Sequence, residues 1–345
     1  MVGSAQTSPI RTETGEKHMT FRKRTGRQRA IGLMFRVLGR MMVGLLRVRV
    51  VRLLLLGAML LFGLRSCSAP DLRIGTFNIR TFGHKTDRVR LTEILAELDA
   101  DVIAIQEIRD EQALRALAAE LSAKTSRSYQ AVSSDCGGRQ RLHLGFLFDK
   151  SRASLDSVRE FPELREDRSG SCFDGDRTGL LGSFSSRGRL SFRSTKTHLL
   201  TVHFPAGADF EQAQNRQLSL QRALRILESL RKSGEDRVVL LGDLNTTGYV
   251  DDQYGERSAV HRQLEQAGIK PLTDDLSCSA YWKPTWRSPY QPGKLDHIFA
   301  TGSLKTAAPP SVQGFCATLG CQPSTRVPPD FDAVSDHCPV LVTLR

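Results

Sequence analysis

Short apolar runs alternate with helical periodicities along most of the chain after residue 70. The clearest strand signal is the run V-V-L-L-G-D-L-N at Val238–Asn245. An apolar run bounded by Gly and polar residues is typical of a strand buried on both faces. Spacings of i, i+3, i+4 and i+7, as at Leu91, Ile94, Leu95 and Leu98, predict amphipathic helices instead. The domain is therefore expected to mix strands and helices.

The same two patterns place most of the expected elements. We expect strands at Leu72–Ile79, Val102–Ile105, Leu142–Phe148, Thr197–Phe204, Leu295–Ala300 and Pro339–Leu344, and helices at Asp87–Leu98, Glu111–Leu121 and Glu211–Arg231. We find no internal repeat and no clear domain boundary after residue 70. One domain over residues 70–345 is expected.

Polar side chains recur where these strands end. They are Asn78, Glu107, His203, Asp243 with Asn245, Asp296, and Asp336 with His337. An ordinary turn would explain one Asp–Asn pair, but open sheets gather ligands at strand carboxyl ends, so six such endings predict one site. Oxygen donors of this kind favour Mg²⁺, Mn²⁺ or Ca²⁺ over zinc. The chain has neither a serine nucleophile elbow nor a phosphate-binding P-loop.

Composition and charge narrow the function only after the chain is divided. The 345 residues would suffice for one large or two ordinary domains. The net charge of +12 suggests a nucleic-acid partner, but 13 of the 49 Lys+Arg and only 2 of the 37 Asp+Glu lie in residues 1–69. The remainder carries 36 basic and 35 acidic residues. The overall charge therefore says little about the substrate.

Residues 1–69 are predicted to be a basic extension ending in an export signal. Three arginines precede Leu53–Leu64, an unbroken apolar run of twelve. A positive segment followed by a short apolar segment is the pattern of a signal peptide, and a spanning helix would need about twenty apolar residues. We expect export to the extracellular space or the periplasm and envelope, with cleavage near Ala69. Lipidation of Cys67, giving a membrane anchor, is the alternative.

Six cysteines follow the leader: Cys136, Cys172, Cys278, Cys316, Cys321 and Cys338. In an exported protein an even number favours disulfides, although spacing does not fix the connectivity. We expect Cys136–Cys172 and a bond from Cys278 to Cys316 or Cys321. Cys338 is expected to be a buried free thiol in the last strand, which leaves at least one more cysteine unpaired. No pair has the C-x-x-C spacing of a zinc site.

Six short motifs carry a resemblance to a known family. T-F-N-I-R, I-A-I-Q-E-I, T-V-H-F, L-L-G-D-L-N, L-D-H-I-F and S-D-H-C-P-V follow one another along the chain. Their order resembles the endonuclease/exonuclease/phosphatase superfamily, and the resemblance spans about residues 71–345. It implies a four-layer α/β sandwich, with two mostly antiparallel sheets face to face and flanked by helices.

The resemblance also implies a role for each polar strand ending. Glu107 resembles the principal ligand of a Mg²⁺ or Mn²⁺ ion, with Asn78 beside it and Asp336 as a second carboxylate nearby; Ca²⁺ could serve structurally. Asp243 and Asn245 match the pair that positions the nucleophilic water and binds phosphate oxygens. His337 resembles the histidine at the scissile phosphate, oriented by Asp296. His203 and Arg177 match phosphate-binding residues.

Several positions depart from the family pattern or suit a structural role. Relatives often carry Pro at the position of Gly179, which weakens the match of Arg177. The pancreatic deoxyribonuclease pairs a Glu with the histidine that matches His203, and no such Glu is found between Arg139 and His143. His297 follows Asp296 on a strand and is expected to face the core. Trp282 and Trp286 either stack nucleic-acid bases or pack their own loop.

We expect a metal-dependent phosphodiesterase that hydrolyses DNA, with RNA as a further candidate, and with little sequence specificity. A phosphatase or phospholipid phosphodiesterase using the same site is the alternative. A binding protein without catalysis is disfavoured because every polar position of the constellation is present. No protein partner is implied.

Overall fold

The computed structural model describes residues 71–83, 85–165, 177–187 and 194–345, with residues 38, 40, 48, 50–57, 172 and 175. The chain divides into two compact units, Met1–Arg65 and Ser66–Arg345. In the first, residues 51–57 are helical and exposed. No helix among the described residues is long and apolar enough to cross a membrane. Most of the expected export signal, with Cys67 and Ala69, lies outside the described residues.

The second unit contains two six-stranded sheets. The first has the order β13-β14-β1-β2-β4-β3 and the second β5-β6-β7-β8-β12-β9. The strands of the first are β1 (Leu72–Phe82), β2 (Val102–Ile108), β3 (Tyr129–Ser133), β4 (His143–Asp149), β13 (Ser311–Val312) and β14 (Val340–Leu344). Those of the second are β5 (Ala153–Phe161), β6 (Gly179–Arg187), β7 (Ser194–His203), β8 (Val238–Asp243), β9 (Ile269–Pro271) and β12 (Asp296–Thr301). Within these sheets, β1–β2 and β7–β8 pair in parallel and the other pairs are antiparallel.

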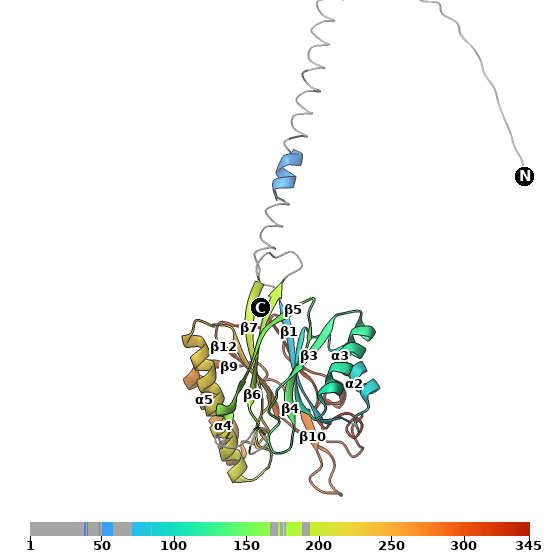
Figure 1. Ribbon diagram of the computed structural model, residues 1–345, viewed down its shortest axis with the longest axis vertical. Coiled ribbons are helices and arrows are strands. Elements are labelled where there is room, and N and C mark those ends of the chain that lie inside the picture. The colour runs from blue at the N-terminus through green and yellow to red at the C-terminus, as the bar shows by residue number, and fades with distance from the viewer. Residues whose placement is uncertain are drawn as a thin grey trace, which may run out of the picture. The chain divides into compact units, whose positions relative to one another are not determined.

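Helices cover the outer face of each sheet, as Figure 1 shows. The helices are α2 (Arg88–Glu97), α3 (Glu111–Thr125), α4 (Phe210–Lys232), α5 (Glu256–Ala267) and the short α6 (Gly314–Thr318). Side chains of α2 and α3 pack on the outer face of the first sheet, and those of α4 and α5 on the second. A third apolar cluster, containing Leu72, Phe146, Leu199 and Leu241, fills the space between the sheets. The predicted four-layer sandwich is confirmed.

Aspartates set the starts of the three helices that the periodicity predicted. The side chains of Asp87, Asp110 and Asp209 each accept a hydrogen bond from a backbone N–H of the following first turn. Such caps satisfy donors that have no partner within the helix. The predicted helices therefore lie within a few residues of α2, α3 and α4. Periodicity did not reveal α5 or strands β3, β5 and β6.

Gly242 allows β7 and β8 to approach in parallel register. Its φ is +144°, and a Cβ placed there would lie 2.1 Å from the carbonyl oxygen of Val202. A side chain would therefore separate the strands. Close pairing places His203 directly beside Asp243. The Gly of L-L-G-D-L-N thus serves the geometry of the strand ends.

The disulfides correct one prediction and confirm another. Cys136–Cys172 is present, as expected, and Cys278 bonds Cys321. The expectation of a free Cys338 is wrong, because Cys338 bonds Cys316. Strand β14 begins only at Val340, so Cys338 lies before it, against α6. All six cysteines are paired.

Candidate active site

The predicted polar residues meet at one edge of the sandwich, where both sheets contribute. Asp243 of β8 pairs across the second sheet with Asp296 of β12 and lies beside His203 of β7. Asn78 of β1, in the first sheet, donates from Nδ2 to Asp243 Oδ2 at 2.9 Å. This side-chain hydrogen bond joins the two sheets. All these residues except Glu107 and Asp336 are buried.

Glu107 is aimed into the site by irregular backbone. Its φ is +66°, and Arg80 and Thr81 on the neighbouring strand have φ of +37° and +49°. Both β1 and β2 shift register at this point, as bulges do where a strand redirects a side chain. Glu107 Oε1 accepts from Asn78 Nδ2 at 3.0 Å, and Oε2 accepts from the Thr81 N–H at 2.8 Å. Strained backbone of this kind gathers at functional sites.

His337 and Asp296, which are 41 positions apart in sequence, form a buried hydrogen-bonded pair. His337 Nδ1 lies 2.8 Å from Asp296 Oδ2, so the ring donates from Nδ1 and its Nε2 faces Asp243 Oδ2 at 3.7 Å. Burial alone would lower the pKa of His337, but the charges of Asp296 and Asp243 outweigh it and raise the pKa well above its usual value. These two neighbours favour the cationic form of the imidazole.

Ser279 contacts the Asp296 carboxylate, and the sequence analysis did not identify it as a site residue. Its hydroxyl donates to Asp296 Oδ2 at 2.8 Å and accepts from the Asp296 N–H at 2.8 Å. These contacts fix the carboxylate that orients His337. Ser279 stands between Cys278 and Ala280 in an irregular segment, and a single serine there carries no pattern that would have identified it.

Asp243 is held by amide donors on both carboxylate oxygens. Oδ1 accepts from the Asn245 N–H at 2.8 Å, while Oδ2 accepts from Asn78. Burial raises the pKa of Asp243 to about 7, against the opposing charge of His337. Asn245 takes a left-handed φ of +53° and donates from Nδ2 to the Phe204 carbonyl at 3.0 Å. The predicted Asp243–Asn245 pair thus lies on the same side, in contact.

The imidazole ring of His203 faces the carboxylates of Asp243 and Glu107 through its Nε2 atom. Its Nε2 lies 3.4 Å from Asp243 Oδ2 and 3.8 Å from Glu107 Oε1, and Nδ1 has no hydrogen-bond partner among the described residues. The glutamate missing from the sequence is therefore not replaced there. Burial, with the positive charges of Arg177 and His337, holds the pKa of His203 well below its usual value. Arg177 itself donates from Nη2 to Gln140 Oε1 at 2.8 Å.

Asp336 lies on the rim, apart from the buried group. Its side chain is 35% exposed, and Oδ1 is 4.0 Å from Arg80 Nη1. Its backbone carbonyl accepts from the Tyr281 N–H at 2.9 Å. Asp336 is therefore tethered beside His337, with its carboxylate open to solvent.

Two sets of residues could hold a cation. Ligand atoms of Asp243, Asp296 and His337 all lie within 4.8 Å of one another. That set is already engaged, because Asp296 accepts from His337 and Ser279, and Asp243 accepts from Asn78 and Asn245. Glu107 is better suited: its carboxylate is oriented by Asn78 and Thr81 and is 16% exposed. Oxygen donors at a partly open carboxylate suit Mg²⁺ or Mn²⁺.

His297, Trp282 and Trp286 lie outside this cluster of polar side chains. His297 is buried, as expected, and its Nε2 bonds the Thr246 hydroxyl at 2.7 Å. Trp282 and Trp286 are 53% and 77% exposed, so packing within their own loop does not account for them.

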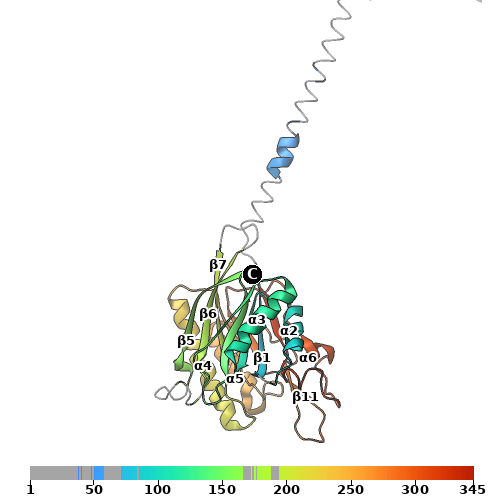
Figure 2. The ribbon, with the colours of Figure 1, turned by 45° about the vertical axis from the view of Figure 1, so that its right-hand side comes forward.

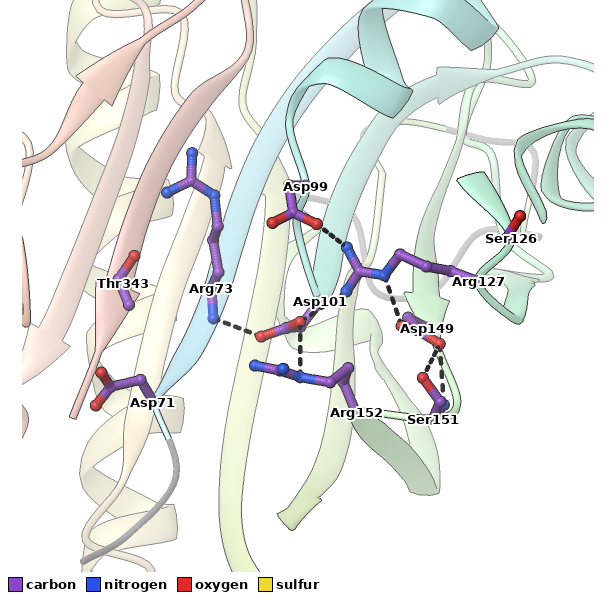
Figure 3. Close-up of a pocket in the computed structure, with 10 residues that line it drawn as sticks. All are labelled: Asp71, Arg73, Asp99, Asp101, Ser126, Arg127, Asp149, Ser151, Arg152 and Thr343. Carbon is purple, nitrogen blue, oxygen red and sulfur yellow. Dashed lines mark hydrogen bonds and ion pairs between the residues drawn. The ribbon is translucent and has the colours of Figure 1, made fainter. Parts of the chain in front are cut away.

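A cavity of about 470 Å³ lies at the opposite edge of the first sheet, where β1 begins and β4 ends. Figure 3 shows Arg127 in contact with Asp99, Asp101 and Asp149. Arg152 also pairs with Asp101, whereas Asp71 pairs with Arg345 and the Arg73 side chain donates to the Leu98 carbonyl. The cavity is remote from the strand ends that carry Asn78 and Glu107. We assign this network a structural role.

Comparison with known proteins agrees with this geometry. Residues 75–337 match the model of the Endonuclease/Exonuclease/phosphatase family. Among curated proteins none matches the chain significantly. Solved structures of similar fold include the endonuclease/exonuclease/phosphatase from Bacteroides vulgatus, with 17% identity, a TM-score of 0.54, and coverage of 80% of this chain and 99% of that one.

Two further structures are similar in fold. The human Nocturnin catalytic domain, with bound sulfate, has 14% identity and a TM-score of 0.54, covering 81% of this chain and 95% of that one. D. rerio TDP2 complexed with single strand DNA product has 18% identity and a TM-score of 0.50, covering 80% and 99%. Identities this low show the fold alone. The family match over most of the chain shows more: this protein belongs to the endonuclease/exonuclease/phosphatase family and is a metal-dependent phosphoric-ester hydrolase.

Proposed function

We propose that this chain is an exported, Mg²⁺-dependent phosphodiesterase that cleaves DNA, and RNA as a second substrate, with little sequence specificity. One observation carries the proposal. Asp243 faces His337, whose cationic form its carboxylate neighbours favour, across a buried site with Glu107 at its mouth. This is the arrangement that hydrolysis of a phosphodiester by water needs.

Glu107, with Asn78 and Asp336, would hold the metal ion. A divalent ion at this position supplies Lewis acidity and neutralises charge on the phosphate. Within the described residues, histidines are the ion-pair partners of three carboxylates at the site. His203 pairs with Glu107 and Asp243, and His337 pairs with Asp243 and Asp296. A cluster with this excess of carboxylates suits a cation.

The chain's own residues would divide the remaining work. Asp243 and Asn245 position the attacking water, and Asp243 accepts its proton. His337, fixed by Asp296, faces the phosphate with Nε2 and stabilises negative charge or protonates the leaving oxygen. His203 and Arg177 bind phosphate oxygens. General acid–base help of this kind is worth about 10²–10⁴-fold in rate.

A basic groove beside the site favours a polyanionic substrate. A cavity of about 690 Å³ is lined by Thr81, whose N–H bonds Glu107, and by the cations Lys85, Arg109, Arg139 and Arg141. These four cations come from three separate segments and are exposed. Phosphate contacts of this kind dominate nucleic-acid affinity and weaken as salt is added. A small phosphomonoester would not reach across such a surface.

Export is supported by the cysteines. Three disulfides persist in an oxidising compartment and are rare in the cytosol. We place the enzyme in the periplasm, the envelope or the extracellular medium, held to a membrane only through its leader or a lipid on Cys67.

A substrate panel tests the proposal. Purified protein with Mg²⁺ or Mn²⁺ would be given plasmid DNA, RNA, sphingomyelin and inositol phosphates under identical conditions. We expect nicking of plasmid DNA that falls as salt is raised. Turnover of sphingomyelin or of an inositol phosphate, with plasmid left intact, would instead establish the phospholipid or phosphatase activity.

A further inference from the structure

Both tryptophans of the chain lie on one exposed hairpin. The hairpin pairs β10 (Ala280–Trp282) with β11 (Gln291–Gly293), and it projects from the sandwich in Figures 1 and 2. The chain contains two Trp residues in total. Trp282 is 53% exposed and Trp286 77%. Two exposed tryptophans on one hairpin form a candidate contact surface.

The base of the hairpin is bonded directly to the catalytic segment. Ala280 pairs with His337 in an antiparallel bridge, and the Tyr281 N–H donates to the Asp336 carbonyl at 2.9 Å. Ser279, the residue before β10, holds Asp296. The Cys278–Cys321 and Cys316–Cys338 disulfides fasten the same region. The hairpin is therefore a rigid extension of the scaffold that positions His337.

Strand alternation places Trp282 on the catalytic face. Residues that pair across antiparallel strands point to the same side, as do residues two apart on one strand. Ala280 pairs with His337 and is two positions from Trp282, so Trp282 and His337 share a face. Tyr281 points the other way and packs with Cys338 in a separate buried cluster. Trp282 lies two residues from the bridge, about 7 Å along the strand.

Charge on the hairpin identifies the class of partner. Residues 282–291 read W-K-P-T-W-R-S-P-Y-Q, with two cations and no acid. The Arg287 guanidinium lies over the Trp286 ring at 4.4 Å, and the Lys283 ammonium over Tyr290 at 4.9 Å. Aromatic rings interleaved with cations bind a strand that offers flat bases and phosphates together.

We propose that the β10–β11 hairpin is a base-stacking arm for unpaired nucleotides flanking the phosphate that lies at His337. Trp282 stacks the nearer base and Trp286 a farther one, while Lys283 and Arg287 contact phosphates. Bases in a duplex are not open to such stacking, so single-stranded or frayed nucleic acid is the preferred substrate. This inference rests on the proposed nuclease function and specifies its substrate class.

Intrinsic fluorescence tests binding without turnover, because every tryptophan reports on this hairpin. The full chain in EDTA would be titrated with a single-stranded oligonucleotide, the matching duplex, and an abasic strand of the same length and charge. We expect quenching by the base-containing single strand at concentrations where the other two have little effect. Trp282→Phe and Trp286→Phe assign the signal to each residue. Equal quenching by the abasic strand would overturn stacking.

A lipid surface is the competing partner for exposed tryptophans beside cations. Vesicles of phosphatidylcholine and phosphatidylglycerol would be titrated in the same assay. A blue shift with these vesicles, without quenching by any oligonucleotide, would overturn the proposal and make the hairpin a membrane contact.

Cleavage kinetics distinguish an error in the proposed base-stacking arm from an error in the proposed nuclease activity. Trp282→Ala should raise KM for the single strand about 10-fold, given the usual worth of one base–aromatic stack, and should raise KM for the abasic strand much less. Trp282→Phe should keep most of the affinity, whereas Trp282→Leu should not. If wild type cleaves DNA but Trp282→Ala and Trp286→Ala match it on all substrates, the arm is wrong and the nuclease stands. If wild type cleaves no nucleic acid, the nuclease itself is wrong.

Discussion

At the scale of single residues, the site depends on ionisable side chains that are buried, although such groups usually lie at the protein surface. Asp296 and His337 are buried and bond each other at 2.8 Å. Each would be costly to bury alone, because an isolated charge loses its hydration. Together they fix the ring so that Nε2 faces Asp243. The pair therefore acts as a unit.

Removing either member of this unit should cost almost as much as removing both. We predict that His337→Ala and the double change Asp296→Ala/His337→Ala lose similar activity, on the order of 10³-fold. Groups that act together are non-additive in this way. Steady-state kinetics of the two single variants and the double variant provide the check. Strictly multiplicative losses would show that the two residues act independently.

Asp243 should make the protein less stable at neutral pH than at mildly acidic pH. Its pKa is about 7 in the folded chain, against 3.8 ordinarily. The folded state therefore holds the proton more tightly than the unfolded chain, and this contribution to stability is lost as pH rises toward 7.

The Asp243→Asn variant carries a neutral amide at this position, so it does not gain the charge that wild type gains as pH rises. The difference in melting temperature, variant minus wild type, should therefore increase by several degrees between pH 5 and pH 8. In a domain of this size, 1 kcal/mol of stability corresponds to about 2–4 °C. Calorimetry in EDTA measures this, and catalysis should be lost. A difference that stays constant with pH would rule out the assigned burial of charge.

At the scale of elements, the apolar patterns in the sequence predicted those helices and strands whose formation depends mainly on burying apolar side chains. Strands β1, β2, β4, β7, β8, β12 and β14 are mostly buried apolar segments, and helices α2–α4 each have an apolar face. All of these were predictable. The bulges that turn Glu107 and Arg80 to positive φ were not, because side chains from neighbouring strands determine them. Ser279 was missed for the same reason. Cys338 was misjudged because its partner, in α6, is 22 residues away in a segment without periodicity.

The Cys316–Cys338 disulfide should stabilise the segment that carries His337. Replacing both cysteines by Ala should lower the free energy of unfolding by about 3 kcal/mol, as expected for a closed loop of this length. It should also reduce kcat more than KM, because His337 adjoins Cys338. The Cys136→Ala/Cys172→Ala variant is the comparison, since neither of these cysteines adjoins His337 in sequence. Denaturant unfolding and kinetics of both variants check this, and equal effects on kcat would contradict it.

At the scale of the whole molecule, the family's fold could be inferred from six motifs, whereas the substrate could not. The motifs identify the family as a whole, and its name covers nucleases and phosphatases alike. The groove joins Arg109 and Arg139, which are distant in sequence. The hairpin with Trp282 and Trp286 meets the distant segment of His337 through Ala280. Only the folded chain shows that both adjoin the strand ends with Glu107 and His337.

The leader should be absent from the working enzyme. Leu53–Leu64 behind three arginines predicts export, so the mature protein should begin after about residue 66 and be found outside the cytoplasm. N-terminal sequencing of protein from separated fractions tests this. Recovery of Met1 from a cytoplasmic fraction would contradict it.

The central claim is that Glu107 holds the metal while His337 acts on the phosphate. The most direct test is a Mg²⁺ titration of phosphodiesterase activity for wild type, Glu107→Ala and His337→Ala. We predict that Glu107→Ala needs more Mg²⁺ for half-maximal activity and recovers part of its rate at high concentration. His337→Ala should keep the wild-type midpoint at a much lower maximal rate. A Glu107→Ala variant with the wild-type midpoint, or a His337→Ala variant rescued by Mg²⁺, would contradict this assignment.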